Sequence, residues 1–167
     1  WAFDEVWDAW EELERGDKLN TQVDWFTITA ALRREPEIAC YSDAERDRML
    51  LLHPVAGLHL PLNVVEALIA ANPSALSSQS TNGGLTPLMI ACGRNASRRV
   101  VRLLISKDRK ALNLRDASGY AAIHWACREN ASHEVMKEVL WNDPDQAWRM
   151  MQKPAILAAP YIAQHHM

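Results

Sequence analysis

Six histidines and three cysteines are the side chains of this 167-residue chain that could support catalysis or bind a metal. The adjacent pair His165 and His166 offers two imidazoles, but no thiol or carboxylate pair stands near it at the spacing of a metal site. A solvated tail is the favoured interpretation of this pair. Asn82, Gly83 and Gly84 form a turn signal rather than a phosphate-binding loop between a strand and a helix. The sequence therefore predicts no metal, no cofactor and no catalytic residues, and we expect no enzyme activity from this segment.

The cysteines restrict the redox environment. Cys40, Cys92 and Cys127 are odd in number and widely spaced, which argues against a disulfide framework and for reduced thiols. We therefore expect an intracellular, reducing environment, either the cytoplasm or the interior of an organelle.

Composition and charge exclude several classes of function. Apolar residues make up 49% of the chain and charged residues 23%, which is typical of a folded domain. The net charge of -3 lacks the basic excess that neutralises a phosphate backbone, so we expect no nucleic-acid partner. No apolar run approaches the roughly 20 residues of a spanning helix, so no membrane span is expected in this segment. The chain begins with Trp1 rather than Met, and we expect a fragment of a longer protein or a processed product.

Helical periodicity dominates the sequence and predicts an all-α fold. Val6, Trp7 and Trp10 share one stripe of an acidic helix near the start, and Gly16 is placed to end it. We interpret residues 1–22 as a Trp-rich helix that caps one end of the fold. The alternative is that this aromatic cluster docks on a partner.

The chain repeats itself. Leucines recur at intervals of 36 residues, at Leu32, Leu68, Leu104 and Leu140. Glycines and Ala-Cys pairs recur at an interval of 35, at Gly84 and Gly119, and at Cys92 and Cys127. The difference of one residue predicts a small insertion near Asn142. Such a repeat predicts stacked helical units that bury their apolar surface against one another.

The repeated motifs resemble the ankyrin repeat family. The stretch Gly84–Cys92 is similar to the signature G-x-T-P-L-H-x-A-A, and Val100–Leu104 is similar to its V-x-x-L-L second helix. Asp116–Cys127 resembles the next repeat, including its D-x-x-G turn. The resemblance implies a solenoid of antiparallel helix pairs joined by turns. It also places Cys92 and Cys127 where this family has a small buried residue, on stacked helices about 8–10 Å apart and thus too distant for a disulfide.

The units differ in how closely they follow the motif. We assign residues 23–167 to the repeat domain: a partial repeat (23–40), a degenerate repeat (43–76), two clear repeats (81–116 and 117–148), and a degraded C-terminal repeat or cap (149–167). In the degenerate repeat, Pro54 is expected to bend or end the first helix. In the last clear repeat His124 is retained but alanines replace Thr-Pro, so we expect weaker capping of its first helix.

The ankyrin resemblance implies binding of another protein or a multiprotein complex through turn tips and the concave face of the first helices. Carried onto this sequence, the family's variable contact positions fall on Asn82, Leu85, Arg94, Ser118, Tyr120, Arg128 and Glu129. Trp125 is expected in the core. Six basic residues form a local cluster that is either a solvated face or a contact for an acidic partner: Arg98, Arg99, Arg102, Lys107, Arg109 and Lys110.

The expected function is a non-catalytic scaffold, adaptor or structural subunit of a larger assembly. The alternative is a non-catalytic ankyrin segment of a larger enzyme or regulated receptor. A purely architectural subunit without an exchangeable ligand is a third hypothesis.

Overall fold

A computed structural model describes residues 4–15, 24–42, 48–58, 61–81 and 83–145. Within these ranges the regular structure is helical, apart from one isolated bridge between Ser42 and Leu50. The α-helices are α1 (Asp4–Glu14), α2 (Trp25–Arg34), α3 (Leu52–Gly57), α4 (Leu62–Ala71), α5 (Pro87–Gly93), α6 (Arg98–Lys107), α7 (Ala122–Arg128) and α8 (His133–Asn142). Short 3-10 segments follow three of them: η1 (Pro36–Cys40), η2 (Pro73–Ser77) and η3 (Arg109–Leu112).

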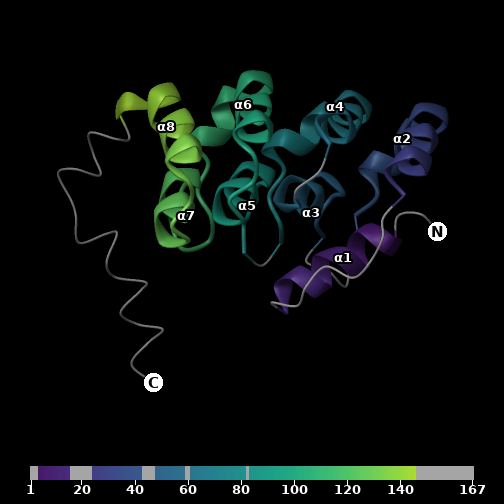
Figure 1. Cartoon of the computed structure of the whole chain (residues 1–167), viewed down its shortest axis with the longest axis horizontal. Coiled ribbons are helices and arrows are strands. Elements are labelled where there is room, and N and C mark those ends of the chain that lie inside the picture. The colour runs from purple at the N-terminus through teal and green to yellow at the C-terminus, as the bar shows by residue number, and fades with distance from the viewer. Residues whose placement is uncertain (1–3, 16–23, 43–47, 59–60, 82, 146–167) are drawn as a thin grey trace.

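The helices form two rows (Figure 1). One row contains α3, α5 and α7, which pack against one another in that order, and the other contains α2, α4, α6 and α8. Each of the pairs α3 and α4, α5 and α6, and α7 and α8 also makes contacts across the rows. This arrangement confirms the predicted all-α solenoid of helix pairs.

Serine side chains begin the second helices of the two clear repeats. Ser97 Oγ accepts the Val100 N–H, and Ser132 Oγ accepts the Val135 N–H, so each serine caps a second helix. Asn95 and Asn130 precede these serines with φ of 52° and 51°. Asn tolerates this left-handed conformation, which turns the chain between the two helices of a unit.

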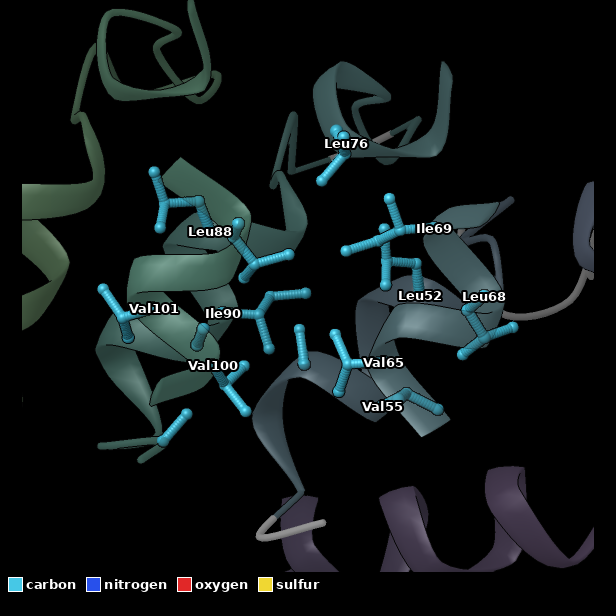
Figure 2. Packing of buried hydrophobic residues seen from close by; sticks show 14 of the residues in the cluster. Leu52, Val55, Val65, Leu68, Ile69, Leu76, Leu88, Ile90, Val100 and Val101 are labelled. Atoms are coloured by element: carbon cyan, nitrogen blue, oxygen red, sulfur yellow. The ribbon is translucent and has the colours of Figure 1, made fainter. Parts of the chain in front are cut away.

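The core runs between the two rows (Figure 2). Leu52 and Val55 from α3 meet Val65 and Leu68 from α4 close to the side chains of α5 and α6. No single pair of short helices buries enough apolar surface alone, so each unit completes the core of its neighbour.

Helix α1 closes one end of the first row. Val6 and Trp7 are buried, and the helix packs against α3, while Asp4 and Asp8 face solvent. These two apolar side chains support the predicted capping role of α1. Trp1 lies outside the described residues, and the side chain of Trp10 does too.

Two details of the predicted repeat are wrong. Helices α2, α4, α6 and α8 begin at residues 25, 62, 98 and 133, so the spacing falls from 37 to 36 to 35 residues. Leu68 and Leu104 are therefore equivalent, whereas Leu32 and Leu140 lie one position later in their helices. The interval of 36 residues still links these four leucines, because two adjacent positions in each of these helices are both apolar. No insertion occurs near Asn142, since α6 and α8 both have ten residues.

Pro54 neither bends nor ends α3, which continues to Gly57. It is the third residue of the helix, where the backbone N–H of any residue would lack an intrahelical acceptor. The proline ring therefore removes no hydrogen bond, and the expected break does not occur.

Candidate protein-binding groove

A hollow of about 270 Å³ lies between the C-terminal ends of α5 and α7. Its lining comes from both helices and from the loop before α5: Leu85, Ile90, Gly93, Arg94, Trp125, Arg128 and Glu129. We call this hollow the groove.

The indole of Trp125 forms the centre of the groove. Its Nε1 donates to Asp116 Oδ2 at 2.9 Å, and the guanidinium carbon of Arg128 lies 3.9 Å from the ring centroid. A cation above an aromatic face is a favourable arrangement. Trp125 is half-buried rather than a core residue, which corrects the sequence prediction. The reason is that Asp116 fixes the polar edge of the indole outside the apolar interior.

Gly93 in the preceding unit leaves the space that the indole occupies. A Cβ at this position would lie 3.2 Å from Trp125 Cε3, closer than an ordinary contact. Any larger residue at position 93 would therefore press on the ring or fill the groove.

Asp116 also shapes the turn beside the groove. Its Oδ1 accepts the N–H groups of Ser118 and Tyr120 at 2.9 and 2.8 Å, and its backbone carbonyl accepts the Gly119 N–H. These bonds hold Ser118 exposed at the tip. They also place the half-buried Tyr120 ring 5.6 Å from that of His124.

Two histidines hold the first helices in place from equivalent positions. His124 Nδ1 accepts the Ala121 N–H at 3.1 Å, and His53 Nδ1 accepts the Leu50 N–H at 3.1 Å. The histidine retained in the last clear repeat therefore bonds the turn at the start of α7. In the unit between them, Thr86 Oγ1 accepts the Met89 N–H instead. Each unit thus satisfies at least one backbone donor at the start of its first helix.

His53 also supports the wall of the groove. Because Nδ1 is an acceptor, the proton is assigned to Nε2, which donates to the carbonyls of Ser78 and Leu85 at 3.2 and 3.1 Å. This fully buried side chain therefore anchors the loop that presents Leu85. A link across 25 and 32 positions leaves no local signal in the sequence.

The charge of the groove comes from three side chains. Arg94 and Arg128 are half-buried, and the exposed Glu129 accepts from Arg128 Nε at 2.8 Å. Two guanidinium groups and one carboxylate leave a net positive charge beside an aromatic surface.

The structure brings four of the proposed contact residues together in the groove: Leu85, Arg94, Arg128 and Glu129. Ser118 and Tyr120 lie on the turn next to it, and Asn82 lies outside the described residues. Ile90 and Trp125 line the groove and were not among the proposed contacts. The pattern of polar and apolar residues in α7 could not show that the Trp125 side chain lines the groove, because the position of that side chain depends on Gly93 and Asp116.

Three of the six residues of the predicted basic cluster make hydrogen bonds to the neighbouring unit. Arg102 donates twice to Glu138, at 3.1 Å each, and Arg98 donates to Glu138 and Glu134 at 2.9 and 3.0 Å. Arg109 donates to the Asn142 carbonyl at 2.6 Å. These three residues therefore connect α6 and η3 to α8, although the Arg98 and Arg102 side chains remain 42% and 58% exposed.

The cysteines of α5 and α7 offer no reactive thiolate. Cys92 is fully buried, and burial raises its pKa to about 12. Burial also raises the pKa of the half-buried Cys127. Both thiols are free, and Cys127 Sγ lies 4.0 Å from Met136 Sδ, so the predicted packing role of this pair is supported.

Metal ligands do not gather in the part of the chain that the structure describes. His165 and His166 lie outside it. Over the same residues, every helix is too short or too polar to cross a membrane.

Comparison with known proteins agrees with this geometry. The family described as ankyrin repeats, in three copies, matches residues 52–147, which is more than half of the chain. No curated protein matches the chain. Ankyrin repeats are in general modules that bind other proteins, and they are typically non-catalytic. The match spans α3 to α8 and includes every described residue of the groove, and the chain belongs to the ankyrin repeat family.

Proposed function

We propose that this chain is a non-catalytic adaptor or subunit that binds an extended segment of another protein in the groove. The observation that carries the proposal is the pocket of about 270 Å³ over Trp125. It has an apolar wall from Leu85 and Ile90 and a charged rim from Arg94 and Arg128. Apolar pockets with a few polar groups at their edge are typical binding sites.

The chemistry of the pocket favours one kind of segment. An aliphatic or aromatic side chain would contact Trp125, and a neighbouring carboxylate would face Arg94 and Arg128. Tyrosine, tryptophan and arginine tend to dominate the free energy of protein interfaces, and Tyr120, Trp125 and Arg128 lie within one turn and one helix. Ser118 and Glu129 would then form the polar rim of the interface.

The free thiols support a reducing compartment for this function. Cys40 is exposed and forms no disulfide, and Cys92 and Cys127 are free thiols that belong to separate helices, α5 and α7. An intracellular protein meets these conditions.

Selection from a random linear peptide library on the immobilised chain tests the proposal. Arg128→Ala and Tyr120→Ala should each weaken the selected peptides by more than about 1 kcal/mol, or about fivefold in Kd. Arg99→Ala is the matched control, because Arg99 is exposed on α6 and lies outside the groove. If the Arg128 and Tyr120 variants both bind the selected peptides as tightly as the Arg99→Ala control, the groove and the turn next to it are not the site.

A further inference from the structure

A second and larger hollow lies at the other end of the stack. It has a volume of about 920 Å³ and lies between α1, the end of α2, η1 and the start of α3. Its lining is Asp4, Trp7, Arg34, Glu35, Pro36, Glu37, Ile38, Cys40, Tyr41 and Leu51. We call it the N-terminal hollow. It shares no described lining residue with the groove, and it lies outside the residues matched by the ankyrin family.

In η1, two residues occur in the opposite order of size to their counterparts in η2 and η3, and this order exposes an apolar side chain to the N-terminal hollow. The residues that directly follow α2, α4 and α6 are Glu35, Asn72 and Asp108, and they have closely similar backbone angles, with φ of -135°, -140° and -145°. Counting from them, η2 has Ala75 then Leu76, and η3 has Ala111 then Leu112. At the same two positions η1 has Ile38 then Ala39.

The reversal changes what the hollow contains. Ala75 and Ala111 are 1% exposed, and the leucines after them are buried in the core. In η1 the smaller Ala39 takes the deep position, and Ile38 is only half-buried and lines the hollow. An isoleucine therefore faces a cavity at the position where the other units bury an alanine.

Further apolar and acidic groups surround Ile38. Tyr41 is 64% exposed, and Pro36 is exposed beside it. Asp4, Glu35 and Glu37 supply three carboxylates against the single guanidinium of Arg34, so the described lining has a net negative charge. The groove has the opposite sign, and the two hollows therefore suit different ligands.

We propose that the N-terminal hollow binds a cationic segment of a partner protein. An apolar side chain of that segment would pack against Ile38 and Tyr41, and a lysine or arginine next to it would face Glu35 and Glu37. The volume falls within the range of about 300–1,000 Å³ that is usual for ligand sites. Charge complementarity of this kind selects a partner and excludes one of the opposite sign.

Cys40 provides a built-in reporter, because it lines the hollow and is exposed. The chain has only three cysteines, and burial raises the pKa of Cys92 to about 12 and also raises that of Cys127. A thiolate is the reacting form, so a disulfide reagent such as Ellman's reagent should modify Cys40 first. Loss of the fast phase in Cys40→Ser identifies that phase.

The test uses two amidated five-residue peptides on the full chain, one alternating lysine with leucine and one alternating glutamate with leucine. The lysine peptide should slow modification of Cys40 in a saturable way, and the glutamate peptide should not. The double variant Glu35→Gln/Glu37→Gln should raise the Kd of the lysine peptide about three- to tenfold, as expected for two exposed charge pairs. Tyr41→Ala should weaken binding by a similar factor without unfolding, because most of this ring is exposed.

The matched control is Glu66→Gln, which removes an exposed carboxylate of α4 that is not part of the hollow. It should leave the Kd of the lysine peptide unchanged. Equal protection by both peptides would overturn the proposal in favour of an uncharged apolar site. So would a lack of protection at millimolar lysine peptide, or an unchanged Kd in both the Glu35/Glu37 and the Tyr41 variants.

Discussion

The indole N–H of Trp125 donates to Asp116 Oδ2 at 2.9 Å, and this bond ties the centre of the groove to the turn beside it. Asp116 is buried, and its other carboxylate oxygen already accepts two backbone N–H groups. The side chain of Asp116 therefore holds both the indole of Trp125, which lines the groove, and the turn that presents Ser118 and Tyr120.

Trp125→Phe should destabilise the chain by about 1–2 kcal/mol, because it retains an aromatic ring but leaves Asp116 Oδ2 without its donor. Urea unfolding followed by far-UV circular dichroism measures this. Trp141→Phe is the matched control, since Trp141 is 81% exposed and should change stability by less than about 0.5 kcal/mol. Equal effects of the two substitutions would mean that the indole bond contributes nothing.

Gly84 and Gly119 have the same left-handed conformation but different surroundings. Gly84 has φ of 65°, and a Cβ there would lie 2.9 Å from the Ala117 backbone nitrogen. Gly119 has φ of 84°, and a Cβ there would meet nothing within 4 Å. Gly119→Ala should therefore cost only the conformational penalty of about 1–2 kcal/mol.

Gly84→Ala should cost about 1 kcal/mol or more beyond that penalty, since the backbone of the next turn must also move. Thermal unfolding of the two variants gives the comparison. A Gly84→Ala protein as stable as Gly119→Ala would contradict the close approach of these two turns.

Glu138 joins the last two outer helices. It is 7% exposed and accepts from both Arg98 and Arg102 of α6. Glu138→Gln should destabilise the chain by about 1–2 kcal/mol, because charge-assisted hydrogen bonds to a shielded carboxylate are lost. Glu134→Gln is the control, and it should cost less than about 0.5 kcal/mol because Glu134 is exposed and makes a single pair.

The pH dependence of stability gives a second readout for Glu138. The hydrogen bond from Arg102, followed by that from Arg98, lowers the pKa of Glu138 below its ordinary value of 4.5, although burial opposes the shift. A carboxylate whose pKa falls on folding stabilises the fold above about pH 4.5, and this contribution is lost as the pH falls through the lowered pKa. Glu138→Gln should reduce the loss of unfolding free energy at acid pH. An unchanged pH dependence would show that protonation of Glu138 is not coupled to folding.

Local sequence signals predicted the features of the fold that depend on neighbouring residues. The serine and threonine caps, the left-handed asparagines and the turn glycines all act within about five residues, so the residues next to them in the sequence are enough to anticipate them. The repeat of apolar residues then predicted the stack. The helix starts shift by one residue from unit to unit, and the interval of 36 residues persists because two adjacent positions of each outer helix are both apolar.

The features that the sequence could not predict depend on residues in different units. Glu138 contacts arginines 36 and 40 positions earlier, and Asn95 accepts the Ser132 N–H across 37 positions. Four of the seven proposed contact residues line the groove, because the family motif fixes which turn positions face it. The prediction that Trp125 lies in the core was wrong, because its exposure is decided by a glycine of α5 in the preceding unit and an aspartate in the turn.

His124 makes the stability of the last described unit sensitive to mild acid. Burial first, and then the charge of Arg115, lowers its pKa below the ordinary value of 6.5, although the charge of Asp116 opposes the shift. The neutral ring is the form that accepts the Ala121 N–H at 3.1 Å, and protonation removes that acceptor.

A histidine whose pKa falls on folding stabilises the fold fully above about pH 6.5, and its contribution is lost as the pH falls toward the lowered pKa. The Ala121 amide, corrected for the intrinsic effect of pH on hydrogen exchange, should therefore lose protection as the pH falls below about 6.5, earlier than the Met89 amide held by Thr86. His124→Gln should abolish this difference in pH dependence, whereas His133→Gln, on the exposed start of α8, should preserve it. Parallel loss of protection at Ala121 and Met89 in the wild-type chain would show that the ring of His124 does not control the start of α7.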